Sequence, residues 1–208
     1  MSAESRVYFY EPKRGHGLPH DPIASIVAPR PIGWISTQDG AGNSNLAPYS
    51  FFNIFNYAPP ILGFASAGYK DTLRNVERTR EFVWNLVTRS LAEPMNATSA
   101  TVASDVDEFR VAGLTAAPSM KVRAPRVAES PVHFECRVTQ IERLTDAAGS
   151  DLPTWLVLGE VVGVHIARDL LDAGIYVTAA AVPVMRGGGR TDYFEVASSA
   201  LFKMAQPG

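Results

Sequence analysis

The residues best suited to chemistry in this sequence are a lysine and a threonine at the start of a short helical pattern. Lys70-Asp71-Thr72 precedes two apolar residues three positions apart, and this spacing predicts a helix over 70–78. A helix N-terminus presents free backbone N–H groups and the positive end of the helix dipole, so a cation and a hydroxyl placed there would bind a phosphate or another anion. The alternative interpretation is that Asp71 or Thr72 only caps the helix.

Two earlier segments could contact a flat, amphipathic ligand. Pro31-Ile32-Gly33-Trp34 supplies a rigid backbone, a glycine that permits close approach, and an indole ring. Asn45-Leu46-Ala47-Pro48-Tyr49-Ser50 supplies amide and hydroxyl groups beside a rigid backbone. Each segment also has a plainer interpretation: the first as a strand with a buried tryptophan, the second as the polar start of an aromatic strand.

Other candidate residues indicate no separate chemistry. The sequence contains no Walker-type phosphate loop, no histidine-glutamate zinc helix and no serine in a nucleophile turn. Cys136 lies on the apolar side of an alternating strand and is expected in the core, whereas His133 lies on its polar side and is expected in solvent. Gly187-Gly188-Gly189 precedes no helical pattern, so it is interpreted as a mobile turn.

Most elements around these residues are predicted to be strands. An alternating strand over 132–139 and a second long strand over 155–166, with bends expected at Gly159 and Gly163, dominate the C-terminal half. Further strands are expected as two pieces within 23–37 and at 46–57, 61–65 and 81–87, and short helices near 94 and 105–108. This pattern favours a mainly β fold with a few helices, built as a closed or partly closed antiparallel barrel and not as a doubly wound sheet.

Composition limits the partners and the location that we expect. The 208 residues contain no linker or repeat, which predicts a single domain over 1–208. A net charge of −2 argues against a general nucleic-acid binder. The single cysteine excludes a disulfide framework and a clustered-cysteine metal site, and it is typical of a reducing compartment. With no signal-like start and no run of 18 apolar residues, we expect a cytoplasmic protein without a membrane partner.

The order of several segments is more specific than any one of them. Arg30–Ser36 (RPIGWIS) is followed by Asn45–Asn53 (NLAPYSFFN), by Lys70–Thr72 with Asn75, and by Glu81–Asn85 (EFVWN); further segments are Glu93–Asn96, Asp107–Phe109, Ala112–Leu114, Ala128–Pro131, Glu135–Cys136 and Gly159–Val161 with His165. In this order, between about residues 23 and 166, they resemble the flavin reductase-like family of FMN-binding split-barrel proteins.

The resemblance implies a fold, an assembly and a set of cofactor contacts. The fold would be a six-stranded antiparallel Greek-key split β-barrel with its core at about 20–170 and a C-terminal extension at 171–208. Two copies would form a homodimer with one FMN near each end of the interface, and residues 93–96 would reach the partner's flavin. Ring and ribityl contacts would come from Arg30, Pro31, Ile32, Gly33, Trp34, Ser36, Asn45, Ala47, Pro48, Tyr49, Ser50 and Phe51, and phosphate contacts from Lys70, Asp71 and Thr72.

The activity implied by the resemblance is that of an FMN-dependent NAD(P)H:flavin reductase, in which a transiently bound reduced nicotinamide passes a hydride to the flavin N5. No protein nucleophile or metal is needed. His165 and Tyr193 are candidates for groups that border the open flavin face, although His165 is also interpretable as an ordinary strand histidine. Relatives carry a Leu-Gly-Gly-Tyr-like segment near the end, and the corresponding segment here, 185–193, is longer and more basic.

Two other functions remain open from the sequence. One is a non-enzymatic, flavoredoxin-like FMN electron carrier that serves a protein partner, and the other is a structural barrel without a ligand. The expected partners are a flavin, a nicotinamide and a monooxygenase or other redox protein.

Overall fold

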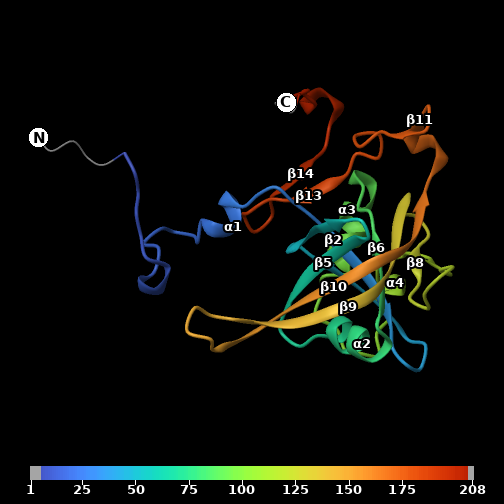
Figure 1. Cartoon of the computed structure of the whole chain (residues 1–208), viewed down its shortest axis with the longest axis horizontal. Coiled ribbons are helices and arrows are strands. Elements are labelled where there is room, and N and C mark those ends of the chain that lie inside the picture. Colours follow the sequence, from blue (N-terminus) through green and yellow to red (C-terminus); the bar gives the residue numbers. More distant parts are fainter. Residues whose placement is uncertain (1–5, 206–208) are drawn as a thin grey trace, which may run out of the picture.

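A seven-stranded antiparallel sheet forms the body of the molecule (Figure 1). The computed structural model describes residues 6–205. The strands follow the order β3-β2-β6-β9-β10-β5-β4. Their bounds are β2 Gly33–Gln38, β3 Ser44–Tyr49, β4 Phe52–Tyr57, β5 Pro60–Ala67, β6 Glu81–Asn85, β9 Val132–Thr145 and β10 Asp151–Ile166. The mainly β fold expected from the sequence is confirmed.

The sheet ends in two edge strands, β3 and β4. No strand pairing joins β3 to β4 within residues 6–205, so the closed six-stranded Greek-key barrel is not confirmed. The two strands are consecutive in the chain, and between them the Phe51 carbonyl accepts a hydrogen bond from the Ala65 N–H at 2.8 Å. Pro48 has no N–H to offer, which suits a strand at the edge of a sheet.

The remaining elements are short. The helices are α1 Ile23–Ile26, α2 Asp71–Thr79, α3 Ala92–Ala97 and α4 Glu108–Val111, with 3-10 turns at Pro12–Arg14, Arg89–Leu91, Arg168–Leu170 and Ser198–Ala200. Short strands pair as β7 Ala116–Ala117 with β8 Arg126–Val127, and as β11 Leu171–Asp172 with β12 Ile175–Tyr176. None of the helices in the described part of the chain is long and apolar enough to cross a membrane.

The strand expected at the start of 23–37 is wrong. Its first part is the helical turn α1, because the Asp21 carboxylate accepts a hydrogen bond from the Ile23 N–H at 3.0 Å and Pro22 begins the turn. The strand character of 33–37 is confirmed by β2.

The long hairpin of β9 and β10 confirms the predicted pair of strands and its bends. The register shifts between Leu158 and Gly159 and again between Val161 and Gly163. A Cβ added at Gly159 would lie 2.4 Å from the Phe82 ring, so this position requires a residue without a side chain. Because Gly159 has no side chain, β10 can pass close to Phe82 of β6.

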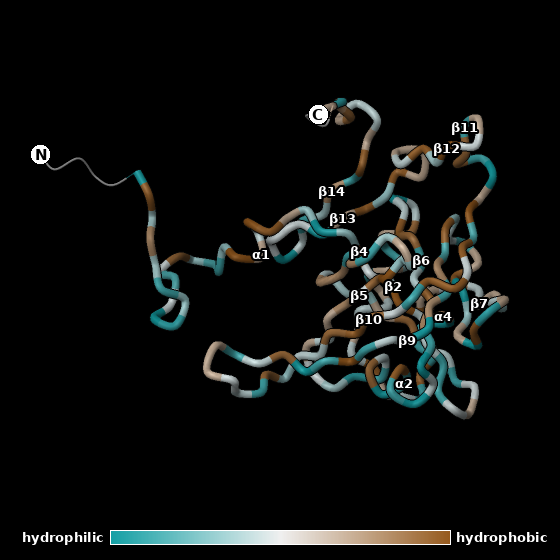
Figure 2. Tube along the Cα trace, viewed as in Figure 1, coloured by the Kyte–Doolittle hydropathy of each residue, from teal (hydrophilic) through white to brown (hydrophobic). Residues whose placement is uncertain are grey.

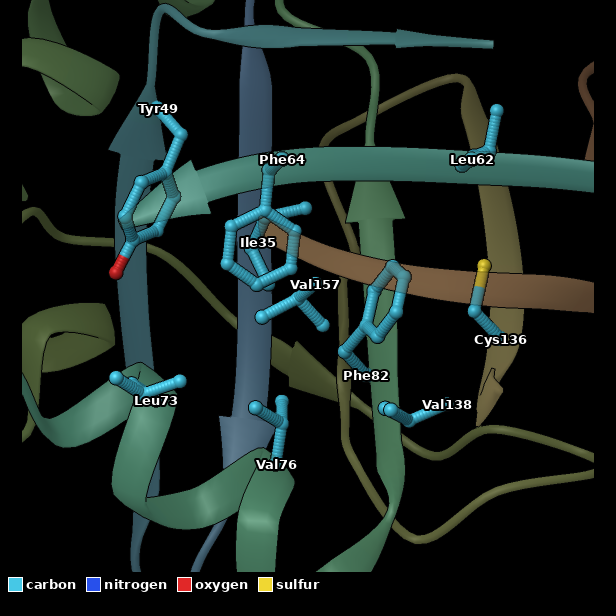
Figure 3. Close-up of a cluster of buried hydrophobic side chains, with 10 residues drawn as sticks. All are labelled: Ile35, Tyr49, Leu62, Phe64, Leu73, Val76, Phe82, Cys136, Val138 and Val157. Atoms are coloured by element: carbon cyan, nitrogen blue, oxygen red, sulfur yellow. The ribbon is translucent and has the colours of Figure 1, made fainter. Parts of the chain in front are cut away.

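The main hydrophobic core lies between the curved sheet and α2 (Figure 3). Leu73 and Val76 of α2 are fully buried against Ile35, Phe64 and Phe82 from three strands of the sheet. Burying each of these side chains stabilises the fold by about 1.5–3 kcal/mol. This packing fixes the direction of α2 and therefore the place where its N-terminus opens.

A second core on the other face of β2 connects the C-terminal part to the body. Trp34 of β2 packs there against Met95 of α3 and Phe109 of α4. Val184 reaches the same cluster from β13 (Val184–Arg186), which pairs with β1 (Arg30–Pro31) and with β14 (Tyr193–Glu195). Residues beyond 170 thus contribute both a strand and a core side chain.

Two terminal segments that expose apolar side chains leave the body (Figures 1 and 2). The N-terminal arm, residues 7–18, extends away from the sheet and exposes 62% of Tyr8 and 80% of Phe9. The Tyr8 hydroxyl donates a hydrogen bond to the His16 carbonyl at 2.9 Å, so the arm folds back on itself. Leu201 and Phe202 near the other end are also exposed.

Candidate functional site

The N-terminus of α2 opens into a cavity without a side-chain cap. Lys70 occupies the N-cap position, and no side chain of the described residues accepts a capping hydrogen bond there. Asp71, one of the two capping candidates from the sequence, instead forms an ion pair with Arg74. The free N–H groups of the first turn, the helix dipole and the Lys70 ammonium therefore converge on one position, and this combination favours an anion.

A hydrogen-bond network ties this helix end to the sheet. The Thr72 hydroxyl, the other capping candidate, accepts a hydrogen bond from the Asn45 side-chain amide at 2.8 Å. The same amide lies 3.4 Å from the Thr37 hydroxyl, which also accepts from Asn75 at 3.1 Å. All four side chains are buried, so the network holds the start of α2 in one position against β2 and β3.

This first cavity has a volume of about 380 Å³. It is lined by Asn45, Ala47, Pro48, Tyr49, Lys70, Asp71, Thr72, Thr98, Ser99, Ala100, Thr101, Val102 and Glu108. The structure thus brings together seven of the residues that the sequence nominated, from β3 and from the start of α2. The opposite wall, residues 98–102 and 108, was not nominated, because only the tertiary fold places it there.

Glu108 is the least expected member of this wall. It is buried, and its carboxylate accepts a hydrogen bond from the Leu46 N–H at 3.2 Å. Burial raises the pKa of Glu108, which moves this carboxyl toward its neutral form. Neither carboxyl group near the helix end therefore adds a full uncompensated negative charge to the cavity. Arg74 compensates the charge of Asp71, and burial shifts Glu108 toward its neutral form.

Tyr49 carries a buried hydroxyl without a partner. The side chain is 6% exposed, and its oxygen makes no hydrogen bond within residues 6–205. Figure 3 shows the hydroxyl directed toward α2. Burial raises the pKa of Tyr49, so the hydroxyl stays protonated and is a hydrogen-bond donor. An unsatisfied buried hydroxyl costs about 1–3 kcal/mol.

A second cavity of about 290 Å³ adjoins the first, with Pro48, Tyr49 and Ser99 in both walls. Its other lining residues are Ile32, Ser50, Met95, Asn96, Arg186, Arg190 and Tyr193. A third cavity of about 450 Å³ shares Asn96 and Tyr193 with the second and includes Arg89, Glu93, Phe194 and Glu195. Together the three form a groove that runs from α2 past the β13–β14 hairpin.

Several residues that the sequence nominated lie away from these cavities. Trp34 and Ser36 have no exposed surface; the Trp34 indole donates to the Thr98 hydroxyl at 3.0 Å and the Ser36 hydroxyl to the Val83 carbonyl at 3.4 Å. Gly33 is buried behind the Phe52 ring. These three residues line none of the three cavities.

Arg30 acts as a connection between chain segments. Its guanidinium donates to the carbonyls of Ser50 at 3.1 Å, Ala24 at 2.5 Å and Gly187 at 3.4 Å, and it lies 5.7 Å from the centre of the Phe51 ring. Arg30, Pro31 and Phe51 line none of the three cavities. Arg30 therefore joins α1, the end of β3 and the glycine-rich turn.

The two candidates for the flavin face separate in the structure. Tyr193 lines the second and third cavities. His165 lines none of the three and instead contacts Glu135, with 2.5 Å between its Nε2 and the carboxylate. Glu135 is fully buried and also accepts hydrogen bonds from the N–H groups of 120–122, so this cluster holds the 116–126 segment against β9.

His133, expected in solvent, is instead buried. It is 4% exposed, its Nε2 lies 2.8 Å from the Val127 carbonyl, and its Nδ1 has no partner among residues 6–205. The strand alternation was correct, but the segment containing Val127 covers this face of β9. Burial lowers the pKa of His133 to about 4. Cys136 lies in the main core, as expected.

Known proteins share this fold and this sequence pattern. A family model described as "Flavin reductase like domain" matches residues 27–184. An uncharacterized protein of Aquifex aeolicus is 36% identical over 174 residues, which cover 81% of this chain and 85% of the relative.

Among solved structures, the nitrilotriacetate monooxygenase component B of Bacillus cereus is similar with a TM-score of 0.80 and 29% identity, covering 87% of this chain and 90% of that chain. A protein with a split barrel domain from Shewanella frigidimarina has a TM-score of 0.77 and 27% identity, covering 88% and 90%. These likenesses support a flavin cofactor and oxidoreductase activity in general, and they confirm the resemblance found in the sequence. The chain belongs to the flavin reductase-like family.

Proposed function

We propose that this protein is an NAD(P)H-dependent flavin reductase that binds FMN in the first and second cavities. The observation that carries the proposal is the uncapped N-terminus of α2, which opens with Lys70 into the first cavity. One phosphate group would satisfy the free N–H groups there and pair with the ammonium.

The residues on the cavity walls fit this cofactor. FMN combines a phosphate, a polar chain and a flat ring, and the groove offers an anion site, then the side chains of Pro48 and Tyr49, then the apolar side chains of Ile32 and Met95. Arg74 compensates the charge of Asp71, and burial shifts Glu108 toward its neutral form, so a phosphate would meet less repulsion. Both the shape and the charge of the groove therefore suit a monophosphate with a ring.

Each wall has a separate task in the proposed reaction. When bound, FMN supplies the ring that accepts a hydride from a reduced nicotinamide. Lys70 and the first turn of α2 hold the phosphate, while the network of Asn45 and Thr72 keeps that turn in place. Pro48 and Tyr49, which line both cavities, provide a rigid wall between phosphate and ring.

The assembly and partners of the protein also belong to this proposal. We expect a homodimer, supported by the exposed apolar side chains along β4, and we expect Glu93 and Asn96 in the third cavity to face the partner copy. The similarity to a monooxygenase component supports a redox protein as a further partner. We also expect one domain over 1–208 and a cytoplasmic location.

Anaerobic rapid mixing of the FMN-loaded protein with NADH or NADPH tests the proposal. A reductase should lose its oxidised-flavin absorbance within seconds with at least one of the two reductants. Flavin that stays oxidised with both, yet is reduced by dithionite, would contradict the reductase activity and favour the electron carrier. Failure to retain FMN at all would contradict flavin binding itself.

A further inference from the structure

The second cavity differs from its two neighbours in the charge of its walls. Its charged lining residues are Arg186 and Arg190, without a carboxylate. The walls of the first cavity contain the carboxyl groups of Asp71 and Glu108 beside Lys70, and those of the third contain Glu93 and Glu195 beside Arg89. The second cavity thus carries positive charge in its walls with no carboxyl group beside it.

Arg186 is held in place with donors left over. Its guanidinium donates to the carbonyls of Asp192 at 2.7 Å and Arg190 at 3.0 Å, and it lies 4.8 Å from the centre of the Tyr193 ring. A guanidinium has five N–H donors, so two hydrogen bonds leave three for a ligand. The Arg190 side chain itself makes no hydrogen bond or ion pair within the described residues.

The turn that carries these arginines is packed against the body and does not project freely. The Gly187 N–H donates to the Asp192 carbonyl at 2.8 Å and closes the β13–β14 hairpin. A Cβ added at Gly188 would come within 2.0 Å of the Ser25 Cα, so only glycine lets α1 approach this closely. The close packing holds the Arg186 guanidinium in the wall that also contains Pro48 and Tyr49, and it places Arg190 in the same wall.

We propose that Arg186 and Arg190 form a second anion site, which binds the phosphate groups of the nicotinamide dinucleotide during its encounter with the flavin. The inference rests on the proposed function. FMN has one phosphate, and the start of α2 already provides for it; neither Lys70 nor Thr72 lines the second cavity. The FMN ring proposed for the second cavity carries no phosphate, and Arg190 in its wall is exposed. Two unpaired cations beside the ring therefore suit a second, phosphate-bearing ligand that reaches the flavin from solvent, and Tyr193 beside them offers a face for one of its rings.

The test compares reductants with and without phosphate groups. FMN-loaded wild type and Arg190→Gln are mixed anaerobically with NADPH, with NADH and with 1-benzyl-1,4-dihydronicotinamide, which has no phosphate. Calorimetry with NADP⁺ measures binding without reduction. Arg168→Gln, which removes an exposed arginine outside the groove, is the matched control, and Arg186→Lys keeps the charge while losing the planar donor set.

We expect Arg190→Gln to raise the half-saturating concentrations of NADPH and NADH about tenfold or more, the effect of losing a charge-assisted hydrogen bond. Reduction by the benzyl compound should not change, and NADP⁺ binding should weaken in parallel. Arg186→Lys should show a smaller effect in the same direction, and Arg168→Gln none.

Three results would overturn the inference: an equal effect on all three reductants, a loss of FMN with unchanged dinucleotide binding, or wild-type protein that binds no NADP⁺. The first two leave the proposed flavin site intact. If the dinucleotides bind through Arg190 but do not reduce the flavin, the second anion site stands and the reductase activity fails.

Discussion

Lys70 is the residue on which phosphate binding most depends in our proposal. It lies at an uncapped helix start in the wall of the first cavity. Lys70→Ala should weaken FMN binding by about 1–3 kcal/mol, the range of a charge-assisted hydrogen bond. Quenching of FMN fluorescence measures the affinity, and Lys203→Ala, which removes a charge from the exposed C-terminal segment, is the control. Equal FMN affinities of Lys70→Ala and wild type would exclude Lys70 from the site.

Tyr49 provides a test in which stability changes and FMN binding does not. Its buried hydroxyl has no partner within the described chain, so Tyr49→Phe should stabilise the flavin-free protein by about 1 kcal/mol. The same substitution should leave FMN binding unchanged, because the hydroxyl oxygen has no accessible surface in the cavity. Thermal unfolding of the flavin-free protein and FMN titration measure the two effects. A clear loss of FMN affinity in Tyr49→Phe would mean that the hydroxyl reaches the ligand.

Among the elements of the fold, β9 carries the buried His133, and we expect the free energy of unfolding to depend on pH through this residue. Its pKa is lowered to about 4 by burial, from 6.5 when unfolded. Between these values the unfolded chain binds more protons than the folded one, so stability is present above about pH 6.5 and is lost as the pH falls toward 4. The total loss from this group is on the order of 3 kcal/mol.

Denaturant unfolding between pH 4 and 8 measures this effect. His133→Gln should flatten the acid side of the stability curve, whereas His20→Gln, at an exposed position, should leave it as in wild type. An unchanged acid slope in His133→Gln would show that another group causes the dependence.

The elements also show how far the sequence could predict the structure. The strands and α2 were predictable because apolar periodicity reflects one buried face and one exposed face. That premise fails for β2, which is buried on both faces, so periodicity could not show that Trp34 faces the second core instead of a ligand. Periodicity also gave the wrong environment for His133, because it could not show that the segment containing Val127 covers the outer face of β9.

The candidate site was predictable where its residues are consecutive in the chain. Lys70–Thr72 and the β3 segment reach the first cavity together, as their order suggested. Glu108, Arg186 and Arg190 enter the groove through tertiary packing. Their segments, 107–109 and 185–193, stood out in the sequence, but local sequence could not show that they reach the same groove.

At the scale of the whole molecule, the exposed apolar edge of the sheet predicts self-association. Among the strands of residues 6–205, β4 pairs with β5 alone, and Ile54, Phe55 and Tyr57 are 52%, 56% and 88% exposed. A hydrophobic, unpaired edge of this kind is normally covered in a stable protein. We therefore expect light scattering to give twice the chain mass of 22.5 kDa.

Tyr57→Glu should shift the measured mass toward that of a single chain, because the substitution places a charge in the expected interface without removing a buried side chain. Met120→Glu, at an exposed apolar residue away from β4, should leave the dimer unchanged. A wild-type protein that is monomeric at every concentration would contradict the expected homodimer.

The central claim is that the start of α2 binds the phosphate of FMN. The most direct measurement is a comparison of FMN with riboflavin, which has the same ring and ribityl chain but no phosphate, by fluorescence titration of the flavin-free protein. FMN should bind at least about tenfold more tightly than riboflavin, because riboflavin lacks the charge-assisted contact. Equal affinities for the two flavins would show that the start of α2 binds no phosphate.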